Sequence, residues 1–83
     1  MSKKEKLKAR LKSKPRDFTF DEAESLLLSL GFEKSNKGKT SGSRVSYDLE
    51  GLPIDMHKPH PRNELPMYQT TKLLKLLQQE GLI

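Results

Sequence analysis

The side chains best suited to chemistry in this sequence are two histidines and two arginines near its middle. His57 and His60, the only histidines, lie three residues apart around a Lys-Pro pair, and Arg62 follows closely. Because polyproline II backbone has three residues per turn, both imidazoles can face the same way there. Arg44 lies in an earlier segment, which the strand pairing considered below brings to the same place.

This set of groups suits metal-free cleavage of RNA. The reaction needs a base for the 2′-hydroxyl, an acid for the leaving oxygen and a cation for the charge that develops on the phosphate. Imidazole titrates near neutral pH and serves as acid or base, while guanidinium offers a fork that matches phosphate. We therefore expect His57, His60 and Arg44 to be the catalytic residues, with no cofactor and no metal ion.

Two other interpretations of the histidines stay open. They can be surface residues of a Pro-rich loop, with rings that pack on the neighbouring prolines. They can also form a His-x-x-His metal site, although no further strong ligand lies at a matching spacing. No Ser-His-Asp order, complete phosphate-binding loop or dinucleotide-binding motif accompanies them.

A second group of polar residues suits contact with the phosphates of RNA. They lie around a Gly- and Ser-rich loop over residues 37–42 or beside the histidines, and the alternative is that they only aid solubility. The residues that we expect to contact RNA are Lys37, Lys39, Ser43, Lys58 and Arg62.

The net charge of the 83-residue chain is +5, but the excess lies at its start. Residues 1–16 hold eight basic residues against the single acid Glu5, a net charge of +7. Residues 17–83 hold the other eight basic residues and ten acids, a net charge of −2. The N-terminal arm is therefore expected to attract nucleic acid in general, while a local positive patch in the body carries the site.

Length and composition exclude several classes of protein. A chain this short forms one small domain that buries only about 60% of its unfolded surface. With no Cys it has no disulfides, and no window is apolar enough to cross a membrane. No apolar run follows the basic start, so we expect a cytoplasmic protein without membrane partners. The expected parts are a basic arm or short helix over residues 1–16 and one domain over residues 17–83.

Three segments have helical patterns. Residues 4–13 carry Leu7 and Leu11 on one face, and this short helix either docks through those leucines or stays mobile. Residues 20–30 begin with a Thr-x-x-Glu capping box and end at a glycine. Residues 68–79 carry a stripe of leucines and also end shortly before a glycine.

Three strands are predicted between the second and third helices, over residues 32–36, 44–49 and 52–57. The last two alternate polar and apolar residues and are separated only by Glu50 and Gly51, which is typical of a hairpin. Tight pairing about this turn sets Arg44 beside His57. Tyr47 falls on the apolar face, so it is predicted to be a core residue rather than a platform for base stacking.

The order of elements, (α)αβββα, predicts an α+β fold. Two helices are expected to cover one face of a three-stranded antiparallel sheet. Pro53, near the start of the last strand, suits an edge strand because proline lacks the N–H that a central strand needs.

Four features from residue 23 to residue 83 recur together in a known family. They are a helix ending in Leu-Gly31-Phe, a Gly-Ser43-x-x-x-Tyr47 strand, a loop with His60-Pro-x-x-Glu-Leu, and a last helix ending in Glu-Gly81-Leu. In this order the chain resembles the HicA-type toxins of bacterial toxin–antitoxin pairs. The resemblance implies a fold like double-stranded-RNA-binding domains, metal-independent endoribonuclease activity on mRNA that inhibits translation, and a HicB-type antitoxin as partner.

The sequence departs from the family at one important position. The family's catalytic His normally follows Gly-Ser on the second strand, and Arg44 stands there. The chain is then an inactive relative, or it uses His57 or His60 as the base, or it belongs to a subgroup built around Gly-Ser-Arg-Val and His-Lys-Pro-His-Pro, which we favour. The alternative functions are a non-catalytic RNA-binding module and a protein-interaction domain on the same fold.

Overall fold

A computed structural model describes residues 2–35, 44–59 and 63–83. Each predicted helix and strand is present, with bounds that agree to within one residue. The predicted loop over residues 37–42 lies outside the described residues. The elements are α1 (Lys3–Lys12), α2 (Phe20–Ser29), β1 (Glu33–Ser35), β2 (Arg44–Leu49), β3 (Leu52–His57) and α3 (Met67–Gln79).

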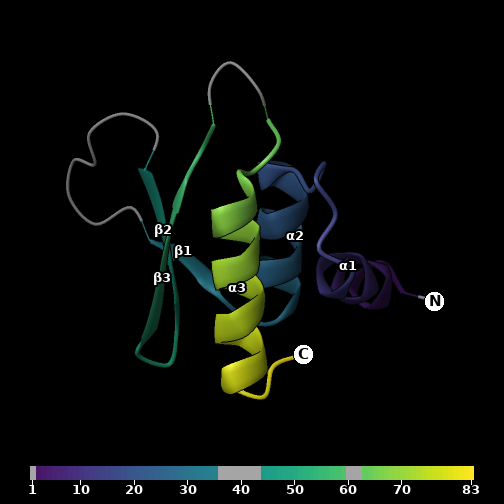
Figure 1. Cartoon of the computed structure of the whole chain (residues 1–83). Coiled ribbons are helices and arrows are strands. Elements are labelled where there is room, and N and C mark those ends of the chain that lie inside the picture. The colour runs from purple at the N-terminus through teal and green to yellow at the C-terminus, as the bar shows by residue number, and fades with distance from the viewer. Residues whose placement is uncertain (1, 36–43, 60–62) are drawn as a thin grey trace.

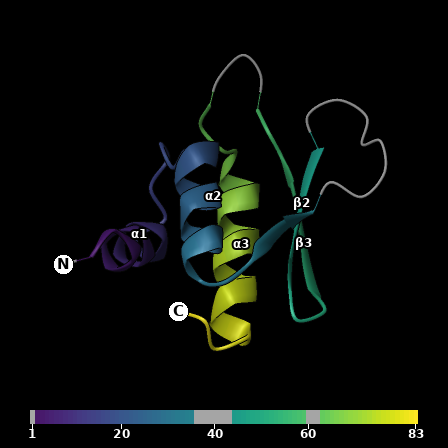
Figure 2. The same cartoon turned by 180° about the vertical axis from the view of Figure 1, so that it is seen from behind.

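The elements form three layers. The strands are antiparallel in the order β1-β2-β3, so β3 is an edge strand, as Pro53 indicates. Helices α2 and α3 cover one face of the sheet, and α1 packs on the side of these helices that faces away from the sheet (Figures 1 and 2). The predicted α+β arrangement is confirmed. In the described part of the chain, no helix is long and apolar enough to cross a membrane.

Helix α2 begins with the predicted capping box. The Thr19 hydroxyl accepts a hydrogen bond from the Glu22 amide at 3.1 Å, and the Glu22 carboxylate accepts one from the Thr19 amide at 3.0 Å. These bonds satisfy amides that have no partner within the helix. Beyond the last residue of the helix, Gly31 has a backbone φ of 106°, a conformation that residues with a Cβ rarely adopt. Local sequence therefore defines both ends of this helix.

The core lies between the sheet and the two helices that cover it. Tyr47, Ile54 and Met56 point from the strands into this core, and all three are buried. The Tyr47 hydroxyl donates to the Glu24 carboxylate, so the polar end of this side chain is satisfied. Burial, together with that bond, raises the pKa of Tyr47. Tyr47 is therefore a core residue, as predicted from the strand pattern.

Helix α1 docks rather than staying mobile. Leu11 is fully buried and Leu7 is 7% exposed, so both belong to the core. The Arg10 guanidinium bonds to the Glu22 carboxylate, and to Asp17 at 3.1 Å. The basic residues that remain exposed on and just after this helix are Lys3, Lys6, Lys12, Lys14 and Arg16.

The segment that leads into α3 makes a pairing that the sequence pattern does not predict. The Leu65 amide donates to the Phe18 carbonyl, and the Phe20 amide donates to the Asn63 carbonyl, both at 2.8 Å. An isolated antiparallel bridge lies between these two bonds. Leu65 itself is buried, so this pairing fixes the approach to α3 against the start of α2.

Replacing Leu11 with Ala is expected to lower the free energy of unfolding by about 2–5 kcal/mol, because it opens a cavity at a fully buried site. Lys12→Ala, on the exposed side of the same helix, should change it by less than about 0.5 kcal/mol. Urea unfolding followed by circular dichroism measures both. Equally small effects would show that α1 is not part of the folded core.

Candidate functional site

The turn between β2 and β3 decides which of their residues face each other. Glu50 and Gly51 both adopt left-handed backbone, with φ of 48° and 90°, as in the two-residue turns that match the twist of a hairpin. The resulting register runs along both strands and sets Arg44 opposite His57 at the far end. The hairpin register predicted from the sequence is therefore observed.

Arg44 and His57 stand on the face of the sheet that is turned away from the helices. Residues directly opposite each other share a face, and side chains alternate between faces along each strand. Tyr47 and Ile54 point into the core, so their neighbours in sequence point outward. The outward residues are Arg44, Ser46 and Asp48 from β2 with Pro53, Asp55 and His57 from β3.

Asp55 fixes the guanidinium of Arg44. Nη2 of Arg44 donates to Oδ2 of Asp55 at 2.8 Å, and Oγ of Ser46 donates to Oδ1 at 2.7 Å. The bonds from Ser46 and from Arg44 hold the pKa of Asp55 below its ordinary value, because they favour the charged carboxylate. The Arg44 side chain is 52% exposed, so further N–H donors of the guanidinium remain for a bound anion.

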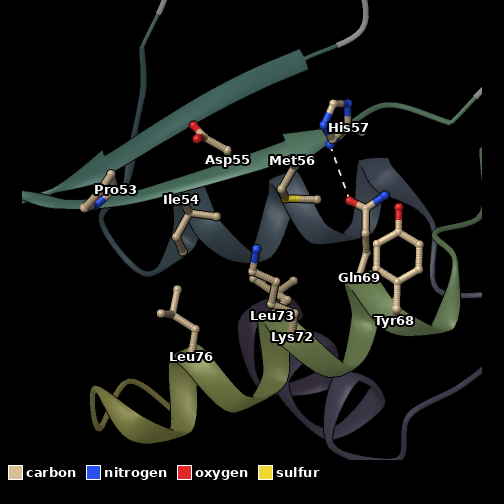
Figure 3. A pocket seen from close by; sticks show the side chains of 10 residues that line it. All are labelled: Pro53, Ile54, Asp55, Met56, His57, Tyr68, Gln69, Lys72, Leu73 and Leu76. Atoms are coloured by element: carbon tan, nitrogen blue, oxygen red, sulfur yellow. Dashed lines mark hydrogen bonds between the residues drawn. The ribbon is translucent and has the colours of Figure 1, made fainter.

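His57 is held from the other side by helix α3. Its backbone N–H donates to Oε1 of Gln69 at 3.3 Å (Figure 3). Since this N–H is directed away from β2, Arg44 and His57 form a non-hydrogen-bonded pair, in which opposing Cα atoms lie only about 4.5 Å apart. The imidazole is exposed and points away from α3 (Figure 3), so it can reach a ligand on the outer face.

A groove of about 270 Å³ lies between the free edge of β3 and helix α3, with His57 at one end. Its deeper part is apolar, and its rim carries an aromatic ring, an amide and an ammonium group. The residues that line it are Pro53, Ile54, Asp55, Met56, His57, Tyr68, Gln69, Lys72, Leu73 and Leu76.

Charge is unevenly distributed along the outer face. Asp48 faces Glu33 of β1 in the register, so acidic residues gather toward the turn. At the opposite end Asp55 pairs with Arg44, and His57 and the exposed Lys58 lie beside them, so Lys58 leaves a net positive charge there. An anionic ligand is therefore favoured at the end where Arg44 and His57 lie.

The structure brings together part of the predicted site. Arg44 and His57 are neighbours, and Lys58 adjoins them; all three side chains are exposed. The roles of all the predicted site residues stay predictions, and the remaining five residues lie outside the described parts of the chain. They are Lys37, Lys39, Ser43, His60 and Arg62.

Three neighbours of this site are not identified by sequence reasoning. Ser46 and Asp55 form the next cross-strand pair on the outer face after Arg44 and His57, so the hairpin register alone is enough to identify them as neighbours of the site. Gln69 has no such signal, because its contact with His57 depends on how α3 docks against the sheet.

The fold and the site define a class of protein: a small α+β domain with a helix, three antiparallel strands and a helix, and with guanidinium and imidazole groups exposed at one strand end. The model of the family described as the HicA toxin of bacterial toxin–antitoxin systems matches residues 20–79, most of the chain. The chain therefore belongs to the HicA toxin family, which implies a cognate antitoxin. No curated protein and no solved structure matches it significantly.

Replacing Ser46 with Ala is expected to raise the pKa of Asp55. The hydrogen bond from Ser46 lowers this pKa more than the bond from Arg44 does, and the substitution removes it. Carbon-detected NMR titration of the Asp55 carboxyl measures the change, and Ser25→Ala on α2 is the control. A lowered pKa adds stability that is lost as pH falls through the folded-state value. The wild type should therefore lose more stability than Ser46→Ala on acidification below the ordinary Asp range; an unchanged Asp55 pKa contradicts the contact.

Proposed function

We propose that this chain is a ribonuclease toxin that binds and cleaves mRNA, inhibits translation in the cytoplasm and is neutralised by a HicB-type antitoxin. Membership of the HicA toxin family supports the toxin role. The observation that carries the chemistry is the pairing of Arg44 with His57 on the exposed end of the hairpin. At that end one phosphodiester can reach a guanidinium and an imidazole together.

The proposed reaction is attack of the RNA 2′-oxygen on the adjacent phosphorus. One histidine takes the proton of the 2′-hydroxyl as the new P–O bond forms, and the other gives a proton to the 5′-oxygen as its bond to phosphorus breaks. The products are a 2′,3′-cyclic phosphate and a 5′-hydroxyl. We assign these two roles to His57 and His60, of which His60 is a candidate from the sequence alone.

Arg44 occupies the position at which the resemblance leads us to expect the family's catalytic His. A guanidinium stays protonated in proteins, so Arg44 cannot act as the base. Its proposed role is electrostatic: it holds the scissile phosphate and stabilises the charge that develops there. The bond from Arg44 to Asp55 supports this role, since it directs the guanidinium along the outer face while leaving other donors exposed.

Two basic surfaces are proposed to hold the RNA. Beside the site, Lys58 contacts phosphates together with the sequence candidates Lys37, Lys39, Ser43 and Arg62. Helix α1 presents exposed lysines on a layer that faces away from the sheet, and this arm over residues 1–16 is an addition to a HicA domain over residues 17–83. Its role is general attraction of the polyanion.

A second candidate is a non-catalytic RNA-binding or protein-interaction module on the same fold. The ion pair between Arg44 and Asp55 favours it, because this pair partly neutralises the residue at the position of the family's His. Such a module binds RNA or a protein partner without breaking a bond.

Replacing Arg44 with Ala is expected to slow RNA cleavage by about 10²–10³-fold, the usual effect of removing a donor that stabilises transition-state charge. Joint replacement of His57 and His60 with Ala should abolish both cleavage and growth arrest, because the acid and the base are then absent. RNA integrity after incubation with purified protein and growth after regulated expression measure the two effects.

Lys75→Ala is the matched control, since it removes an exposed positive charge from α3 outside the hairpin and the groove. Full activity of the double histidine variant contradicts the catalytic assignment. Intact RNA together with clear RNA binding by the wild type supports the non-catalytic module instead.

Replacing the exposed Lys3, Lys6 and Lys12 with Gln is expected to weaken RNA binding without changing the rate of cleavage at saturating RNA. For each lysine that binds a phosphate, its replacement should reduce the slope of log affinity against log salt by about 0.7 for single strands. These changes keep Leu7 and Leu11, whereas deletion of the arm would expose the core. Fluorescence anisotropy over a salt series measures the slope, and an unchanged slope contradicts a role for α1 in attracting RNA.

A further inference from the structure

The groove between β3 and α3 adjoins the proposed cleavage site, and of its lining residues the chemistry proposed above uses only His57, with Asp55 as the partner of Arg44. Tyr68 stands on its rim with 70% of its surface exposed, whereas the other tyrosine, Tyr47, is 1% exposed in the core. An exposed aromatic ring beside a polar site is the usual means by which proteins bind unpaired bases, because every base has a face that stacks.

The polar groups on the rim are arranged to read the edge of a base. Oε1 of Gln69 accepts the His57 N–H, and among the described residues the amide NH₂ of the same side chain donates to no other group, so it can serve a ligand. Lys72 adds a positive charge close enough to Asp55 to help lower the pKa of that carboxylate. The floor beneath these groups is apolar, formed by Ile54, Met56, Leu73 and Leu76 (Figure 3).

The free edge of β3 is poorly suited to pairing with an added strand. Outward N–H groups fall at alternate residues, which are Pro53, Asp55 and His57. Pro53 has no N–H, and the N–H of His57 is already bonded to Gln69. Only Asp55 offers an outward donor between them, so a flat ligand fits this groove better than a peptide strand.

The size of the groove sets a further limit. Its 270 Å³ lies just below the lower end of small-molecule sites, about 300 Å³, so it suits one ring system rather than a nucleotide cofactor. His57 lines one end of the groove and also lies opposite Arg44 in the strand register. A nucleotide whose base enters the groove can therefore place its neighbouring phosphate at Arg44.

We propose that this groove is the subsite for one unpaired base of the RNA, next to the scissile phosphate. Tyr68 stacks on the base, and the Gln69 amide donates to acceptors on its edge. This inference rests on the proposed function and deepens it: the substrate class is single-stranded RNA, because a paired base cannot enter the groove.

A binding experiment that needs no cleavage tests the proposal. The probe is a 2′-O-methylated RNA decamer, which has no 2′-hydroxyl to attack phosphorus, offered as a single strand and as a duplex with its complement. Tyr68→Ala is expected to weaken single-strand binding by roughly 5- to 150-fold, the effect of removing one base–aromatic stack, and to leave duplex binding unchanged. Tyr68→Phe keeps the ring and should bind the single strand as the wild type does.

Leu28→Ala is the matched control, because Leu28 is an exposed apolar residue of α2, 47% exposed and outside the groove. Tyr68→Trp introduces the only Trp of the chain, whose emission should be quenched when the single strand binds. Unchanged single-strand binding by Tyr68→Ala overturns the subsite, even if native RNA is cleaved. If native RNA stays intact while Tyr68→Ala loses single-strand binding, the cleavage proposal fails and the subsite stands.

Discussion

The register of the β2–β3 hairpin is the constraint on which both the core and the candidate site depend. Side chains alternate between the two faces of a strand, so a slip of one residue would exchange them. The two-residue turn at Glu50 and Gly51 excludes that slip, and burial of Tyr47 with its bond to Glu24 opposes it from the core. The same register leaves Arg44 opposite His57 on the outer face.

The hairpin supplies Arg44 and His57 of the candidate site, and the helices add supporting contacts. Helix α3 contributes Gln69, which orients the backbone at His57 and closes part of the sheet edge. The layer beyond carries α1, whose charge is separated from the sheet by α2 and α3 (Figure 2). The net charge of +5 therefore comes from residues 1–16, at +7, against a body at −2. We propose that α1 attracts RNA in general, while the chemistry lies at the small patch that carries Arg44 and His57.

Much of this arrangement is predictable because it depends on local rules. Caps, turn residues and alternation specify the elements and the pairing of Arg44 with His57. Contacts that depend on the docking of distant elements are not predictable in this way. The bond from His57 to Gln69 is one, and the pairing of residues 63–65 with the start of α2 is another. The family resemblance is confirmed, but both the match of Arg44 to the position of the family's His and the role of Arg44 there remain proposals.

The central claim is that the end of the hairpin that carries Arg44 and His57 cleaves RNA by attack of the RNA's 2′-hydroxyl on the adjacent phosphorus. Analysis of the ends of RNA cut by the purified full-length chain tests this claim most directly. The account predicts fragments that end in a 2′,3′-cyclic phosphate and begin with a 5′-hydroxyl. Fragments with a 3′-hydroxyl and a 5′-phosphate, or RNA that stays intact after long incubation, would contradict it.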